Sequence, residues 1–308
     1  MRQAFVQTLI ERAWVDPRII LLTGDLGFTV LEPFRDKFPD RFINVGVAEQ
    51  NLMGIAAGLA LTGRIPVAFS IATFATTRPF EQIRNDIARH RLPVVVVGVG
   101  GGVAYSDALF THHALEDIAL MRVLPGLTVL SPADPVETKW ATKIALSLGA
   151  PVYLRLGKSG EPTLYSKPLP RFQLGKGSVI SRGRDCAILA TGSITSAVLG
   201  ASELLKKHHI DATVVSMHTI KPIDGGLIRS LARKHIPLVT VEEHFVIGGL
   251  GAAVAECLSE EKATGGLLRI GVGDTFVYYS GSHVYVREKI GLSPEGIALK
   301  IRRFLSLS

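Results

Sequence analysis

Short apolar runs alternate with amphipathic helical segments along the first half of the chain, and this order constrains the fold more than any other feature. Within the helical segments, apolar side chains recur at helical spacing, as in Phe80, Ile83 and Ile87. A strand, helix, strand order is typical of a parallel sheet covered by helices on both faces. The expected strands are residues 19–22, 42–45, 66–69, 94–99, 127–130 and 152–156.

The alternation stops near residue 158 and resumes after residue 177. Residues 159–177 are rich in Pro, Gly and Ser and lack apolar periodicity, as a domain linker does. A second α/β series follows, with strands expected at residues 186–190, 212–217, 238–241 and 268–272. The sequence therefore predicts two α/β domains, residues 1–158 and 178–308, each an open, mostly parallel sheet covered by helices.

Composition places the chain among globular proteins. With 308 residues, of which 47% are hydrophobic, it can bury a core in each of two domains. Its two cysteines, Cys186 and Cys257, have no C-x-x-C spacing, which argues against a disulfide framework or a cysteine-based zinc site. The N-terminal segment is predicted to form an amphipathic helix, and no stretch has the length of a membrane span. We therefore expect a cytoplasmic protein that does not enter a membrane.

The net charge of +7 and the pI near 9.5 suit an anionic ligand. Lysine and arginine are scattered among acidic residues, however, with only short clusters such as residues 206–209. We therefore expect anionic small molecules and no nucleic acid as ligands.

Four stretches follow strand candidates at their carboxyl ends, where open parallel sheets bind ligands. We expect them to converge on one cleft. They are Glu49, Thr73 with Phe74, residues 98–113, and Gly157 with Lys158.

Glu49 stands between a short apolar strand and a helix start rich in Ala and Gly. A charged carboxylate is costly in such surroundings unless it is neutral or directed at a basic ligand group. The alternative is that Glu49 caps the following helix, since carboxylates favour the first helical turn.

The segment from Val45 to Gln50 reads Val-Gly-Val-Ala-Glu-Gln and resembles the cofactor-activating motif of the transketolase family. The resemblance implies that Glu49 hydrogen-bonds the aminopyrimidine of thiamine diphosphate. This contact would favour the tautomer that removes the proton from the thiazolium carbon, so proton placement would be the catalytic act.

Other segments extend the resemblance over nearly the whole chain, and they imply further cofactor contacts. Phe74 would pack on the pyrimidine, with Phe80 at a second aromatic position, although Phe80 also fits an ordinary core. Asp25, in Thr-Gly-Asp-Leu-Gly, would lie near the cofactor or form a turn. At Thr77, where transketolases usually present the stacking aromatic, this chain departs from the pattern, which leaves Phe74 with Arg78 or Phe80 nearby.

The segment Thr-His-His at residues 111–113 resembles the family segment whose first histidine reaches the donor substrate. His112 would then be catalytic, because imidazole can donate to a developing alkoxide and exchange protons near neutral pH. His113 is a second substrate-binding candidate or a helix cap. Asp107 and Lys158 complete the expected substrate contacts, with Lys158 at the position of a phosphate-binding arginine.

The wall before His112 differs from that of most relatives. Asp107-Ala-Leu-Phe replaces a Gly-Pro context, and Gly98-Val-Gly-Gly-Gly stands where many transketolases have a phosphate-contacting histidine. We therefore expect a sugar phosphate or a related small-molecule substrate, and the sequence leaves open whether its terminal group is phosphate, sulfonate or neither.

The resemblance covers only the pyrimidine-binding and C-terminal domains of a full-length transketolase. The diphosphate-binding domain, with its Gly-Asp-Gly and Asn signature, has no counterpart here. The resemblance thus implies the C-terminal subunit of a two-component transketolase, with no metal ligands of its own. An N-terminal partner subunit would hold the diphosphate and Mg²⁺. Residues 81–86 resemble the helix where two pyrimidine domains meet, so we expect a dimer within a heterotetramer.

Two alternatives stay open. One is a related thiamine enzyme, either a deoxyxylulose phosphate synthase-like enzyme or the beta subunit of a 2-oxo acid dehydrogenase. The other is a non-catalytic α/β partner subunit that binds no thiamine.

Overall fold

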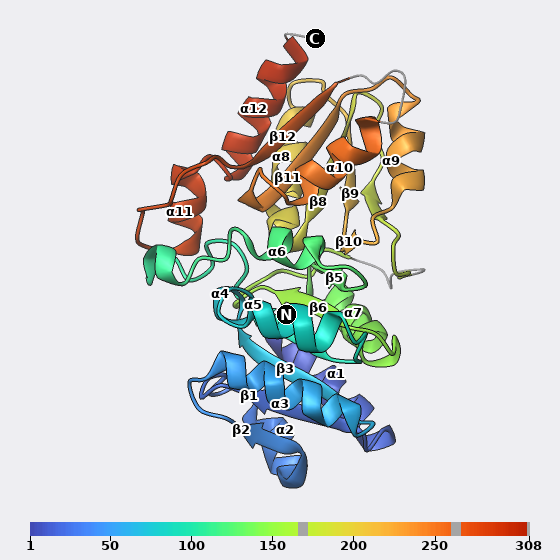
Figure 1. Cartoon of the computed structure of the whole chain (residues 1–308). Coiled ribbons are helices and arrows are strands. Elements are labelled where there is room, and N and C mark those ends of the chain that lie inside the picture. The colour runs from blue at the N-terminus through green and yellow to red at the C-terminus, as the bar shows by residue number, and fades with distance from the viewer. Residues whose placement is uncertain (166–171, 260–265, 307–308) are drawn as a thin grey trace.

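The computed structural model describes residues 1–165, 172–259 and 266–306, and it contains two sheets stacked end to end (Figure 1). The first sheet has seven strands in the order β10-β5-β6-β4-β3-β1-β2, all parallel except β10. Their bounds are β1 (Ile19–Thr23), β2 (Phe42–Asn44), β3 (Ile65–Ile71), β4 (Val95–Val99), β5 (Thr128–Leu130), β6 (Val152–Leu156) and β10 (Thr219–Lys221).

Helices cover both faces of this sheet. On one face, α1 (Arg2–Val15) packs against α7 (Pro135–Ser147), and on the other α3 (Glu49–Leu61) packs beside α5 (Phe80–Gln82) and the π-helix η2 (Ile83–Ala88) (Figure 1). The capping residue Asp134 starts α7, because its side chain accepts a hydrogen bond from the Glu137 N–H at 2.8 Å. Shorter helices complete the unit: α2 (Glu32–Lys37), η1 (Pro39–Arg41), α4 (Ala72–Thr76), η3 (Leu109–Thr111) and α6 (Asp117–Val123).

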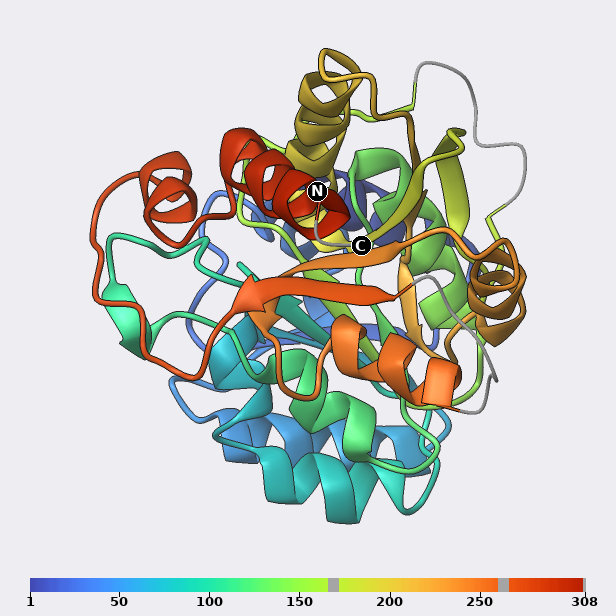
Figure 2. The same ribbon diagram turned by 90° about the horizontal axis from the view of Figure 1, so that it is seen from above.

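The second sheet has five strands in the order β12-β11-β8-β9-β7, parallel except for β7. Helices α8 and α12 pack together on one side of it, and α10, which contacts α9, lies on the other (Figure 2). The bounds are β7 (Ser178–Ser181), β8 (Cys186–Thr191), β9 (Ala212–Ser216), β11 (Leu238–Phe245), β12 (Leu267–Val272), η4 (Gly192–Ile194), α8 (Thr195–Lys206), α9 (Gly225–Ala232), α10 (Leu250–Ser259), α11 (His283–Lys289) and α12 (Pro294–Ser306).

The predicted two-domain α/β fold is confirmed, with two strands that the pattern missed. Strand β10 comes from the second half of the chain but pairs antiparallel with β5 and forms one edge of the first sheet. Strand β7 pairs antiparallel with β9. Both are short segments whose place depends on a distant sheet edge, so local periodicity gives no sign of them. Within the linker predicted over residues 159–177, residues 166–171 lie outside the described residues.

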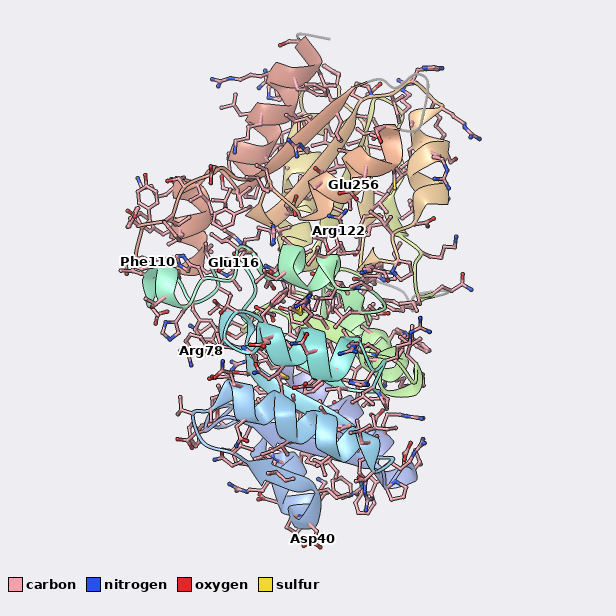
Figure 3. The ribbon with its side chains drawn as sticks, viewed as in Figure 1. Asp40, Arg78, Phe110, Glu116, Arg122 and Glu256 are labelled. Carbon is pink, nitrogen blue, oxygen red and sulfur yellow. The ribbon has the colours of Figure 1, made fainter. Side chains whose placement is uncertain are left out.

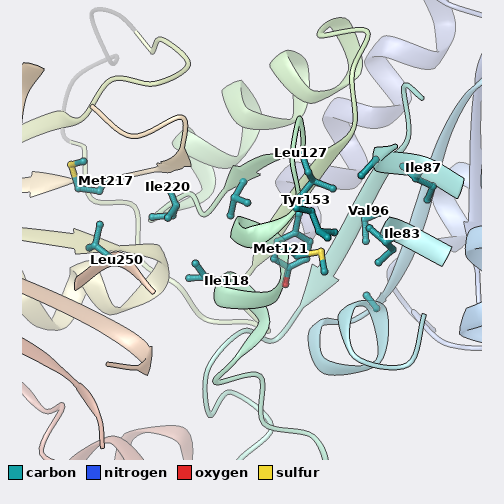
Figure 4. Close-up of a cluster of buried hydrophobic side chains, with 14 of the residues drawn as sticks. Ile83, Ile87, Val96, Ile118, Met121, Leu127, Tyr153, Met217, Ile220 and Leu250 are labelled. Carbon is teal, nitrogen blue, oxygen red and sulfur yellow. The ribbon is translucent and has the colours of Figure 1, made fainter. Parts of the chain in front are cut away.

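A continuous hydrophobic core joins the two units. Met217, Ile220 and Leu250 of the second half pack into the same cluster as Met121 and Tyr153 of the first (Figure 4). The interface between the domains is therefore packed like a domain interior. Within the described ranges, no helix combines the length and apolar character needed to cross a membrane.

Candidate active site

Glu49 is the first residue of α3, directly beyond the carboxyl end of β2, and is only 4% exposed. It lines a hollow of about 580 Å³ together with Val47, Ala48, Gln50, Asn51 and Arg78. The N-cap residue of α3 is Ala48, which makes no side-chain cap, and the Glu49 carboxylate accepts a hydrogen bond from Arg78. The structure thus shows a buried carboxylate that faces a hollow and an arginine. It lies in the first turn of α3, where the capping alternative expects a carboxylate, but it makes no capping hydrogen bond.

Arg78 occupies the space between Glu49 and Phe74. Its Nη1 donates to Glu49 Oε2 at 2.9 Å, and its guanidinium carbon lies 3.7 Å from the centre of the Phe74 ring. The Arg78 side chain is 44% exposed, so the ion pair is partly screened by water. A basic group therefore already meets the carboxylate and the aromatic face that the sequence assigns to a cofactor.

Phe74, in α4 after β3, links this pair to His112. The two rings meet edge to face with their centres 4.9 Å apart. Thr111 Oγ1 lies 2.9 Å from Nδ1 of His112, so Nε2 is the ring nitrogen that a ligand would meet. Four side chains from three strand ends thus form one row: Glu49, Arg78, Phe74 and His112.

Lys158 and Asp107 also come together, on the other side of Tyr105. Lys158 Nζ lies 3.5 Å from Asp107 Oδ1 and 4.3 Å from the centre of the Tyr105 ring, whose centre is 6.1 Å from that of His112. A hydrogen bond from its own backbone and the Lys158 ammonium group hold the pKa of Asp107 below its ordinary value. The two expected substrate contacts therefore neutralise each other.

The structure places three other candidates outside this row. Asp25 has a left-handed backbone (φ 57°), and its amide donates to Asn44 Oδ1 at 2.9 Å, so it makes the turn beside β2. Phe80 packs against the hydrophobic core, as its alternative predicts. His113 is 3% exposed, and neither ring nitrogen has a hydrogen-bond partner among the residues that the structure describes; burial lowers its pKa, which favours the neutral ring. Its contact with substrate stays a prediction.

Sequence reasoning missed the groups that hold the segment carrying His112. Glu243 of β11 accepts from the Val103 amide at 2.8 Å and is 2% exposed. Burial alone would raise the pKa of Glu243, but the neighbouring Arg287 and His283 hold it well below its ordinary value. Gly102 has φ 74°, and a Cβ there would lie 2.5 Å from the Glu243 side chain. The available signal was the run of two glutamates and a histidine inside an apolar strand, at residues 242–244.

Arg155 of β6 also holds the segment that carries His112. Its guanidinium donates to both oxygens of Asp117, at 2.7 and 3.1 Å, and to the carbonyl oxygens of Ala114 and Glu243 at 2.9 and 3.0 Å. The segment between β4 and α6 is therefore fixed to both domains. Among the described residues, no group of three or more His, Cys, Asp or Glu side chains is arranged to hold a metal ion.

Taken together, these contacts define an α/β chain with a buried carboxylate, an aromatic ring and a histidine aligned at the strand ends. The sequence model of the transketolase pyrimidine-binding domain matches residues 1–162, and that of the transketolase C-terminal domain matches residues 175–297. The chain belongs to the transketolase family, as the resemblance predicted.

Relatives of similar length are single subunits. An apulose-4-phosphate transketolase subunit of Phocaeicola vulgatus is 36% identical over 99% of this chain and 97% of that protein. The 6-deoxy-6-sulfo-D-fructose transketolase subunit SqwH of Clostridium sp. (strain MSTE9) is 39% identical over 96% of this chain and 92% of its own length. These relatives confirm the prediction of a transketolase-family enzyme that acts as a subunit.

A solved structure described as a split gene transketolase, inactive beta4 tetramer, has a TM-score of 0.90 and 42% identity, and covers 99% of this chain and 98% of that one. The 1-deoxy-D-xylulose-5-phosphate synthase of Gloeobacter violaceus is 39% identical over 98% of this chain, which spans 48% of that enzyme. The match to chains of the same length favours the transketolase subunit over the synthase.

Proposed function

We propose that this chain is the C-terminal subunit of a two-component transketolase and transfers a two-carbon ketol unit from a ketose donor to an aldose acceptor. The observation that carries the proposal is the buried Glu49 carboxylate that lines its hollow, in one row with Arg78, Phe74 and His112. The split relatives support the same assignment.

The residues present fit the pyrimidine half of thiamine diphosphate. Glu49 would offer a carboxylate to a ring nitrogen and Phe74 a flat aromatic face, once the half-exposed Arg78 side chain, which contacts both, moves aside. When bound, thiamine diphosphate supplies a carbon nucleophile and an electron sink. These 308 residues carry no Gly-Asp-Gly signature, and the relatives of similar length are named as subunits, which supports an N-terminal partner subunit that would hold the diphosphate and Mg²⁺ in a heterotetramer.

Each residue of the row then has one task. Glu49 holds a proton at the pyrimidine nitrogen, which sets the tautomer of the ring. Phe74 excludes water and fixes the ring plane. His112, whose Nδ1 contacts Thr111, presents Nε2 to the donor hydroxyl or carbonyl group and donates to or accepts from it.

The substrate terminus would meet Lys158 and Asp107. Because Lys158 is already paired with a carboxylate, a terminal phosphate or sulfonate would have to displace Asp107. A lysine also lacks the bidentate fork of an arginine. Because the pair is exposed and weak, and lysine also binds phosphate as a point charge, the assay over a panel of ketoses decides whether the terminal group is phosphate, sulfonate or neither.

The test is to mix this chain with an N-terminal transketolase subunit, thiamine diphosphate and Mg²⁺, and to follow two-carbon transfer over a panel of ketoses. Glu49→Gln keeps the shape of the side chain but loses the acidic proton, so turnover should fall by at least about 100-fold, as expected when general acid catalysis is removed. The matched control is Glu11→Gln, an exposed glutamate on α1.

Two outcomes would contradict the proposal. Turnover of Glu49→Gln near the unmutated level would refute the role of the carboxylate. Release of carbon dioxide from pyruvate, with no transfer from any ketose, would favour the synthase or dehydrogenase alternatives.

A further inference from the structure

Aromatic side chains gather on the surface beside the row that contains His112. Phe110 is 47% exposed, Phe276 63% and Tyr278 70%, and the Phe110 ring centre lies 6.0 Å from that of Phe276 and 5.9 Å from that of Tyr278. We call these three side chains the aromatic rim. It lies at the outer edge of the molecule, where Figure 3 labels Phe110, on the side that also carries Arg78.

Exposed aromatic side chains are concentrated at and next to the rim and are not spread evenly over the surface. Eight aromatic side chains of the described residues are strongly exposed, and five of them belong to the rim or to the adjoining Tyr279 and Tyr285. Exposed apolar patches of this kind mark interaction sites, and aromatic side chains dominate the binding energy of protein interfaces.

Both domains build the rim, and both hold it in place. Phe110 belongs to η3 of the first domain, and the other two rings follow β12 of the second. Val277, between Phe276 and Tyr278, is 3% exposed and packs into the core of the second domain. Ser106 Oγ donates to the Gly281 carbonyl oxygen at 2.7 Å, which ties the two segments together. The exposed rings are therefore presented by an anchored backbone, so little conformational entropy is lost when they are covered.

We propose that the aromatic rim is a docking surface for the N-terminal partner subunit, and this inference rests on the function proposed above. The rim adjoins the candidate active site, because Phe110 belongs to η3, the same turn whose Thr111 Oγ1 lies 2.9 Å from His112 Nδ1. The partner that completes this site must therefore approach the same face. Because both domains build this surface, a partner that docks on it would bind only the correctly folded chain.

The experiment measures assembly apart from catalysis. Phe276→Ala, Tyr278→Ala and the double variant are titrated with the purified N-terminal transketolase subunit of the same organism. Sedimentation velocity reports complex formation, and two-carbon transfer reports activity. Trp140→Ala on α7 is the matched control, because Trp140 is 41% exposed but lies outside the rim. Thermal unfolding of each isolated chain checks that the exposed substitutions leave the fold intact.

Loss of a buried interface anchor weakens binding by roughly tenfold or more, so each single variant should need about ten times more partner for half-maximal assembly. At saturating partner, kcat should be unchanged. Glu49→Gln should show the reverse, with normal assembly and no turnover, so failure of the proposed function is distinguishable from failure of the rim. Unchanged assembly of the double variant would overturn the proposal. So would a change in KM alone, or a change confined to self-association of this chain.

Discussion

Replacing Arg155 by Met tests whether the buried ion pair with Asp117 holds the segment that carries His112. The Asp117 carboxylate is fully buried, and the two hydrogen bonds from Arg155 join a third from the Tyr153 hydroxyl at 2.6 Å. Removing the guanidinium leaves a buried carboxylate with one of its three donors. It also leaves the carbonyl oxygens of Ala114 and Glu243 without this partner.

Breaking one side of a buried ion pair costs about 3–5 kcal/mol of unfolding free energy. A chain of this length gains roughly 0.65 kcal/mol/K of entropy on unfolding at about 2.1 cal/mol/K per residue. The melting temperature of Arg155→Met should therefore fall by about 5–8 °C in differential scanning calorimetry. The substitution should also accelerate amide hydrogen exchange more strongly in the segment between β4 and α6 than in the strands.

The double variant Arg155→Met with Asp117→Asn is the control, because it removes the uncompensated charge. It should recover part of the lost stability. A melting temperature of Arg155→Met within 1 °C of the unmutated chain, roughly 0.65 kcal/mol on the same scale, would show that the pair does not anchor this segment.

Three further predictions follow from other contacts. Burial raises the pKa of Glu137 to about 7, so the folded state keeps a proton that the unfolded state loses above about pH 4.5. The contribution of Glu137 to the free energy of unfolding should therefore fall by about 3 kcal/mol as the pH rises from about 4.5 to 7. Urea unfolding of Glu137→Gln should lack this pH dependence. Gly102→Ala should lower the melting temperature, because it combines a strained φ of 74° with a contact at 2.5 Å to Glu243; an unchanged value would mean that the segment relaxes freely. Arg78→Met removes the partner of Glu49. Because the arginine is 44% exposed, the pair contributes only about 1 kcal/mol, so thiamine diphosphate should bind roughly fivefold more tightly by calorimetry; weaker binding would show that Arg78 contacts the cofactor itself.

Much of the site was predictable, because it lies at strand ends. The apolar runs before Glu49, Phe74 and Lys158 are strands of one parallel sheet, so their carboxyl ends share an edge. The pattern could not show that Arg78 fills the space between Glu49 and Phe74, since that depends on the turn between α4 and α5.

The inward position of His113 was equally hidden, because an unpaired histidine looks the same in sequence whether it faces a cleft or an interior. Its neighbour Glu243 lies 130 residues further along the chain. The packing of β11 against the segment after β4 brings the two domains into contact there, through the hydrogen bond from Val103 to Glu243.

The sequence by itself determined the two α/β units and the order of strands and helices within them, because the spacing of apolar residues sets which face of each element is buried. It also carried the motif that identifies the family. Tertiary structure alone decided that β10 crosses into the first sheet, that Glu243 and Arg155 clamp the His112 segment, and that the aromatic rim forms from both domains. These features depend on contacts between residues far apart in the chain, whose geometry is fixed only when the shared core is packed.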